Sequence, residues 1–167
     1  VLAAVRLTHA ALQVMRRRGE GGIINVSSVA GFFLGPGNAT YCATKAYLTN
    51  FTETLHLELK GTGIRVQAFC PGFTITDFHR RLGYDTGSEF FKGFMSAEFV
   101  VRESLRDFAK GKVVSVPGWR YKLLINVPRI LPRKLYYIAV ARTRRSQRRR
   151  GGAPIEGMEK RPDLTAQ

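Results

Sequence analysis

Cysteine is scarce in this sequence of 167 residues, which contains only Cys42 and Cys70. Two thiols cannot build the disulfide framework of a small secreted domain or a four-thiolate metal site, so no metal is implied and a reducing cytoplasm is the expected location. Long hydrophobic runs are also lacking, because prolines and basic residues interrupt the most apolar stretch, residues 123–141. A spanning helix needs about 20 apolar residues, so we expect no transmembrane segment. We expect no signal peptide either, since no basic stretch precedes the first apolar residues.

Acidic residues are missing from one segment. The net charge of the chain is +15, yet residues 1–118 carry 14 basic and 9 acidic side chains, whereas residues 119–150 carry 11 basic and no acidic ones. The positive charge therefore belongs mainly to one C-terminal segment. Because neither a recognition motif nor a platform of stacking aromatic residues accompanies it, we expect no binding of nucleic acid.

Helical and strand patterns alternate along the first 118 residues. Apolar spacing and cap residues predict helices over residues 1–18, 38–60 and 96–110, with Gly19 ending the first, Asn38 capping the second and Ser96 opening the third. Short apolar runs predict strands over residues 23–26, 64–70 and 113–116. This order predicts an α/β fold, part of a Rossmann-like doubly wound parallel sheet. Residues 73–95 show no clean period and are expected to form an irregular, aromatic-rich insertion.

We expect three regions: a sheet domain over residues 1–118, a basic and apolar helical extension over residues 119–150, and a disordered tail over residues 151–167. The sheet domain begins with a helix and contains no Gly-rich turn of the kind that binds dinucleotides. We therefore expect that this chain is the C-terminal part of a longer protein.

One group of residues has the composition of a proton-transfer site. Tyr41 and Lys45 are four residues apart on a predicted helix, so their side chains share one face, and Ser28 follows the first predicted strand. Ligands of parallel sheets bind at the carboxyl ends of the strands. An ammonium favours the anion of a neighbouring phenol, and a hydroxyl can hold a substrate oxygen. A Tyr-x-x-x-Lys pair alone would usually be only a solvated pair.

Three motifs together resemble the short-chain dehydrogenase/reductase family, whose members interconvert carbonyls and alcohols with NAD or NADP. They are Ile24-Asn25-Val26-Ser27-Ser28-Val29-Ala30-Gly31, Tyr41-Cys42-Ala43-Thr44-Lys45 and the segment from Ile64 to Thr76 that contains Pro71-Gly72. The resemblance implies that Ser28 orients the substrate carbonyl, that Tyr41 is the general acid or base, and that Lys45 binds the nicotinamide ribose. The implied cofactor contacts are Tyr41, Lys45, Pro71, Gly72, Phe73, Thr74 and Thr76.

The family's Thr-Gly-x-x-x-Gly-x-Gly turn and Asn-Ala-Gly segment do not occur in this chain. Its active-site Asn would fall just before Val1. The resemblance thus predicts the catalytic portion of an NAD(P)-dependent oxidoreductase whose N-terminal cofactor-binding half is missing. We therefore expect this chain alone to be inactive and to bind no dinucleotide tightly, because the Gly-rich turn that would hold the pyrophosphate does not occur in it. The alternative is an inactive fragment or pseudo-enzyme that binds without turnover.

The substrate and partners are predicted less directly. Rings between Phe73 and Phe94 could line a cleft for a lipophilic ketone or alcohol, or could cover the sheet edge. The resemblance also implies a homo-oligomer. The segment after residue 118 has two alternative roles: packing on its own sheet or a partner, or peripheral contact with an anionic membrane, with Trp119, Tyr121, Tyr136 and Tyr137 at headgroup level.

Overall fold

The structure is a computed structural model that describes residues 1–76 and 92–149. Its main helices are α1 (Leu2–Arg18), α2 (Ala39–Glu58), α4 (Ala97–Ala109) and α7 (Arg133–Arg149), with shorter helices η1 (Val29–Phe32), α5 (Trp119–Leu124) and α6 (Val127–Ile130). The strands are β1 (Gly21–Val26), β2 (Ile64–Phe69), β3 (Thr74–Ile75), β4 (Met95–Ser96) and β5 (Val114–Ser115).

Strands β1, β2 and β5 form a parallel sheet in that order, with Gly21 opposite Ile64 and Ala68 opposite Val114. The expected α/β fold with parallel strands is therefore confirmed. The insertion is not wholly irregular, because β3 and β4 pair as a second, two-stranded parallel sheet. This pairing could not be predicted from local patterns, since each strand has only two residues. The remainder of the aromatic insertion, residues 77–91, lies outside the described residues.

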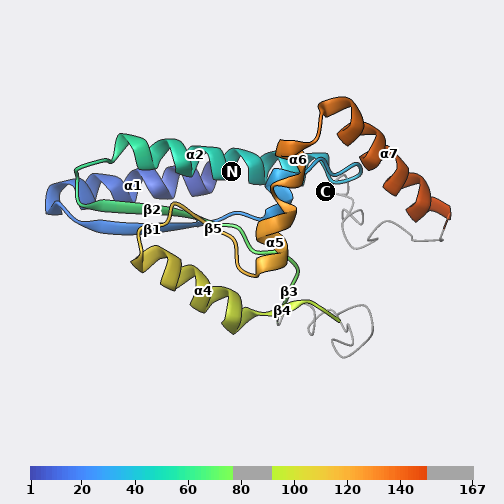
Figure 1. Ribbon diagram of the computed structural model, residues 1–167. Coiled ribbons are helices and arrows are strands. Elements are labelled where there is room, and N and C mark those ends of the chain that lie inside the picture. The colour runs from blue at the N-terminus through green and yellow to red at the C-terminus, as the bar shows by residue number, and fades with distance from the viewer. Residues whose placement is uncertain (77–91, 150–167) are drawn as a thin grey trace, which may run out of the picture.

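The sheet is the middle layer of three. Helices α1 and α2 cover one face and α4 covers the other, while α5 and α6 lie beyond the ends of the strands (Figure 1). The largest apolar cluster fills the space between the helix pair and the sheet, and burial of each such side chain contributes about 1.5–3 kcal/mol. Its buried members are Leu12, Leu55, Leu59, Ile64 and Val66.

A chain of polar side chains is also buried between α1, β1 and α2. The Thr8 hydroxyl donates to the Asn25 amide oxygen over 3.3 Å, and the Asn25 amide nitrogen donates to the Thr52 hydroxyl over 3.0 Å. Thr52 in turn donates to the Leu48 carbonyl over 2.7 Å. The amide is therefore satisfied, which removes most of the cost of burying it.

Two details of the helices differ from expectation. Asn38 occupies the N-cap position of α2 but makes no side-chain capping bond, whereas the Ser96 hydroxyl does accept from the Phe99 amide, as expected. The apolar spacing of residues 96–110 predicts an inward face made of Phe99, Val100, Leu105 and Phe108, but Leu105 is 54% exposed. The buried residues of α4 are Val100, Ser104 and Asp107. The two polar ones can be buried because they have hydrogen-bond partners on β2, on β5 and at Lys112.

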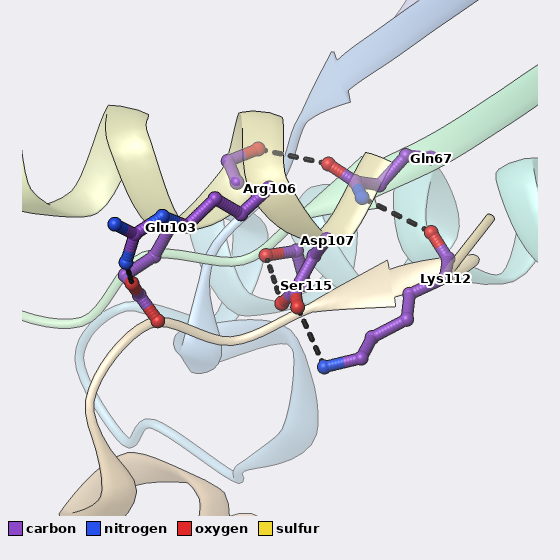
Figure 2. Close-up of polar contacts among 7 residues, drawn as sticks. Gln67, Glu103, Arg106, Asp107, Lys112 and Ser115 are labelled. Carbon is purple, nitrogen blue, oxygen red and sulfur yellow. Dashed lines mark hydrogen bonds and ion pairs between the residues drawn. The ribbon is translucent and has the colours of Figure 1, made fainter. Parts of the chain in front are cut away.

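Those partners are shown in Figure 2. Gln67 of β2 is fully buried; its amide oxygen accepts from the Ser104 hydroxyl over 2.8 Å, and its amide nitrogen donates to the Lys112 carbonyl over 3.0 Å. The Asp107 carboxylate accepts from the Lys112 ammonium over 2.6 Å and from the Ser115 hydroxyl over 2.9 Å. These bonds attach the C-terminal end of α4 to β2 and β5.

The C-terminal segment is divided into three helices, and Pro128 lies in the first turn of α6, as expected of a residue that cannot continue a helix. Tyr121 and Ile125 pack against a second buried cluster formed by Ala68, Cys70 and Val116. The beginning of the segment therefore packs on its own sheet. Within residues 1–76 and 92–149, no helix has both the length and the apolar character needed to cross a bilayer.

The Asp107 contacts predict a pH-dependent stability. Burial disfavours the ionised carboxyl, but hydrogen bonds from Lys112 and Ser115 and the Lys112 charge outweigh it and hold the pKa of Asp107 below its ordinary value of 3.8. A lowered pKa stabilises the folded state above pH 3.8, and this contribution is lost as the pH falls through the folded value. Asp107→Asn should therefore lower the free energy of unfolding near neutral pH by about 1–3 kcal/mol. It should also flatten the acid decline, as measured by urea denaturation across pH.

Glu103→Gln is the matched control, because Glu103 pairs over 3.1 Å with Arg106 on the same helix, where the arginine is mostly exposed. Such a pair contributes about 0.5 kcal/mol or less. If both variants lost equal stability at neutral pH, the stabilising role of Asp107 would be wrong.

Candidate active site

Ser28 lies where β1 ends, at the carboxyl edge of the sheet. It is almost fully buried, and its extended backbone begins η1, where its hydroxyl accepts the Ala30 amide hydrogen over 3.1 Å. One N–H bond leaves the hydroxyl its own hydrogen to donate. The backbone amide of Val29 donates to the Pro71 carbonyl over 3.1 Å, so the Ser28 segment is bonded to the turn that follows β2.

Tyr41 and Lys45 lie one turn apart near the start of α2, as the sequence predicts. The Lys45 ammonium is 5.8 Å from the centroid of the Tyr41 ring and donates to the Val26 carbonyl over 3.0 Å. Tyr41 is 42% exposed, so its phenol is open to solvent. The structure thus brings the ammonium beside the phenol and against the end of the strand that leads into Ser28.

Ser27 holds strand and helix together. It is buried, and its hydroxyl donates to the Lys45 carbonyl over 2.8 Å and lies 2.7 Å from the Thr49 hydroxyl. Its position directly after a predicted strand suggests only that Ser27 satisfies backbone groups at the end of that strand. It does so for a backbone carbonyl of α2, and this bond places Lys45 relative to β1.

Gly31 allows η1 to approach α2 closely. A Cβ atom built at this residue would lie 2.8 Å from the Ala46 nitrogen and 2.8 Å from the Lys45 carbonyl carbon. Real side chains do not approach backbone atoms so closely, so only glycine fits here. Gly31 lies inside a recognised motif, but its contact with α2 could not be read from the motif.

The turn after β2 contains the remaining expected residues. Pro71 and Gly72 are half-buried, and the Thr74 hydroxyl donates to the Gly72 carbonyl over 2.9 Å. Phe73 is 65% exposed, and its ring stacks on Phe94 with centroids 5.0 Å apart. Thr76 is half-buried, directly after β3. The turn therefore lies beside the Ser28 segment, to which Pro71 is bonded, and contact of these residues with a cofactor stays a prediction.

Tyr121 and Tyr136, two of the four aromatic residues that a membrane contact would place at headgroup level, form hydrogen bonds within the chain. The Tyr121 hydroxyl accepts from the Phe73 amide over 3.0 Å, and the Tyr136 hydroxyl accepts from the Leu34 amide over 2.9 Å. Both hydroxyls are thus engaged by backbone groups of the same chain. The sequence contains no signal for these contacts, which join distant segments.

The cysteines take no part in the site. Cys70 is completely buried, and burial raises the pKa of its thiol, although hydrogen bonds to Thr49 and Ser27 oppose this. A thiol kept neutral is a poor nucleophile and a poor metal ligand. Cys42 is half-buried and unpaired with another cysteine.

The layered parallel sheet, with a hydroxyl, a phenol and an ammonium at its carboxyl edge, defines a Rossmann-like α/β protein. Residues 1–86 match the family described as short chain dehydrogenase. The chain belongs to the short-chain dehydrogenase family.

Relatives extend this match over most of the chain. An uncharacterised oxidoreductase of Myxococcus xanthus is 32% identical over 145 residues, which cover 86% of this chain and 55% of the relative. A short-chain dehydrogenase from Sphingobium yanoikuyae, solved in complex with NADPH, is 31% identical to this chain, with a TM-score of 0.63. The match covers 77% of this chain and 51% of the relative.

An alcohol dehydrogenase from Comamonas testosteroni, described as specific for bulky-bulky ketones, is 26% identical to this chain, with a TM-score of 0.61. The match covers 95% of this chain and 55% of the relative. The chain thus spans about half the length of these three relatives.

The close approach at Gly31 predicts a specific loss of stability. Gly31→Ala should lower the free energy of unfolding by about 1–3 kcal/mol, because a Cβ would overlap the α2 backbone, which cannot move aside. Gly35→Ala is the control: its Cβ would meet only the Cys42 thiol, which can rotate away. Urea denaturation compares them. An equal loss in both variants would contradict the assigned contact.

Proposed function

We propose that this chain carries the catalytic groups of an NAD(P)-dependent oxidoreductase that interconverts a carbonyl and an alcohol. The observation that supports it is the common location of Ser28, Tyr41 and Lys45 at the carboxyl edge of a parallel sheet. Membership of the short-chain dehydrogenase family supports the same reaction.

The residues at this edge fit a dinucleotide in their chemistry. An ammonium carries three N–H donors, and the Val26 carbonyl accepts one from Lys45, so two donors can serve a ribose diol. The exposed Tyr41 phenol lies one helical turn away. The relative solved with NADPH supports nicotinamide nucleotides as cofactors, with both NAD and NADP to be tested.

In this proposal the three side chains have different roles. The bound nucleotide supplies or accepts the hydride. Tyr41 donates a proton to the carbonyl oxygen during reduction and removes it during oxidation. Ser28 holds the same oxygen through its hydroxyl hydrogen, while Lys45 binds the ribose and favours the negative charge that develops on the phenol.

We also propose that the substrate is hydrophobic. The exposed Phe73 ring and its stacking partner Phe94 flank the turn that is bonded to the Ser28 segment. The Comamonas relative, described as specific for bulky-bulky ketones, supports a lipophilic ketone or alcohol. Assembly into a homo-oligomer, which the family resemblance implies, stays a prediction.

Tyr41→Phe should reduce turnover of a hydrophobic ketone such as decalone by at least about a hundredfold, because it deletes the proton donor and keeps the ring. Ser28→Ala should mainly lower kcat, and Lys45→Ala should also weaken nucleotide binding. Oxidation of NADH and NADPH, followed by absorbance, measures all three variants, each made in the longer protein that includes the cofactor-binding half expected upstream of this chain.

Tyr47→Phe is the matched control: this tyrosine is half-exposed on α2 and its ring stacks on Phe51. Activity of Tyr41→Phe equal to that of Tyr47→Phe would refute the assignment of Tyr41. The alternative is a pseudo-enzyme that binds nucleotide or ketone without turnover. Calorimetric titration identifies it as binding in a protein that shows no oxidation of NADH or NADPH.

A peripheral contact with anionic lipid is the remaining hypothesis for the C-terminal helices. Residues 119–150 carry no acidic side chain, and apolar residues of α5 to α7 are exposed, among them Trp119, Leu123, Ile130 and Ile138. Charge complementarity supports a negatively charged surface over a second copy of this basic segment, since each basic residue near such a surface contributes about 1 kcal/mol.

Sedimentation with vesicles tests this hypothesis. The protein should pellet with phosphatidylserine-containing vesicles at low salt and remain in solution with pure phosphatidylcholine vesicles, and Ile130→Glu should weaken the binding. Equal recovery in the supernatant with both vesicles would leave packing as the only role of the segment.

A further inference from the structure

The C-terminal helices contact both backbone segments that surround the candidate site. Helix α5 contributes Tyr121, whose hydroxyl accepts from the Phe73 amide, in the turn after β2. Helix α7 contributes Tyr136, whose hydroxyl accepts from the Leu34 amide, in the loop between η1 and α2. In sequence, Leu34 lies between Ser28 and Tyr41. Two hydroxyls from outside the sheet domain therefore satisfy amides on two different segments beside the site.

Tyr121 is attached to the turn by its ring as well as by its hydroxyl. A Cβ atom built at Gly72 would overlap the Tyr121 ring, so the ring occupies the space that a side chain at Gly72 would need. The same ring packs against the buried cluster of Ala68, Cys70 and Val116. Packing against the sheet therefore holds the Tyr121 ring in place, and the hydroxyl of this ring restrains the turn through its bond to the Phe73 amide.

The turn that Tyr121 restrains is also hydrogen-bonded to the residue next to Ser28. Phe73 is bonded to Tyr121, and two residues earlier the Pro71 carbonyl accepts the Val29 amide over 3.1 Å. Val29 is the neighbour of Ser28. A shift of the turn would therefore move a backbone bond that adjoins the serine hydroxyl.

We infer that Tyr121 and Tyr136 are positioning residues of the active site: Tyr121 orders the turn expected to contact the nucleotide, and Tyr136 orders the loop between the two residues expected to hold the carbonyl. This inference rests on the proposed function for its kinetic consequences. The ordering of the two backbone segments does not depend on that function.

The test uses variants that keep the ring and delete only the hydroxyl. Tyr121→Phe should raise the KM for NADPH by roughly two- to tenfold, the range that one neutral hydrogen bond supports, with a smaller change in kcat. Tyr136→Phe should raise the KM for decalone and leave the KM for NADPH nearly unchanged. A merely structural role would lower stability without this division between the two KM values.

Tyr137→Phe is the matched control, because this residue is half-exposed on the same helix as Tyr136 and undergoes the same chemical change. Amide hydrogen exchange gives a second measurement that needs no turnover. Exchange of the Phe73 amide should accelerate several-fold in Tyr121→Phe, and that of Leu34 in Tyr136→Phe, with neither changed in Tyr137→Phe.

Unchanged exchange at Phe73 and Leu34 would overturn the inference, as would KM values equal to those of Tyr137→Phe in an active enzyme. If the longer protein, with the N-terminal cofactor-binding half that the sequence predicts to be missing here, reduced no ketone with either nucleotide, the proposed function would fail. The exchange rates alone would then decide whether the two tyrosines order these segments.

Discussion

A buried hydroxyl joins the end of the first strand to the helix that carries the phenol and the ammonium. The Ser27 side chain donates to the Lys45 carbonyl and contacts Thr49, so β1 and α2 are fixed to one another at the edge where Ser28 and Tyr41 lie. The Lys45 carbonyl also accepts from the Thr49 hydroxyl over 3.1 Å, so loss of the Ser27 bond would cost about 0.5–1.5 kcal/mol, the net contribution of one hydrogen bond. The geometry of every catalytic group proposed here depends on that attachment.

Further contacts strengthen the same edge, and two of them come from outside the sheet domain. Gly31 lets η1 lie directly on the α2 backbone, and the turn after β2 is bonded to the residue next to Ser28. The hydroxyls of Tyr121 and Tyr136 satisfy amides on the two adjoining loops. Rigid elements position catalytic groups more accurately than isolated loops do, and here short loops gain rigidity from their neighbours.

Local patterns predicted the α/β alternation and the residues Ser28, Tyr41 and Lys45, because helix spacing and strand ends are properties of short segments. They could not predict contacts between distant segments, such as that of Tyr136 with Leu34. They also placed Leu105 inside and did not expect a buried Asp107, since a charged side chain is buried only where three-dimensional structure supplies its partners.

The buried Asn25 amide has a consequence for the accuracy of folding. Its oxygen and nitrogen meet Thr8 and Thr52, which lie on two different helices on one side of the sheet. If β1 paired with β2 one residue out of register, alternation along the strand would turn this amide to the opposite face, away from both hydroxyls. An amide buried without partners costs about 1–3 kcal/mol, so the two threonines select the correct strand alignment while the chain folds.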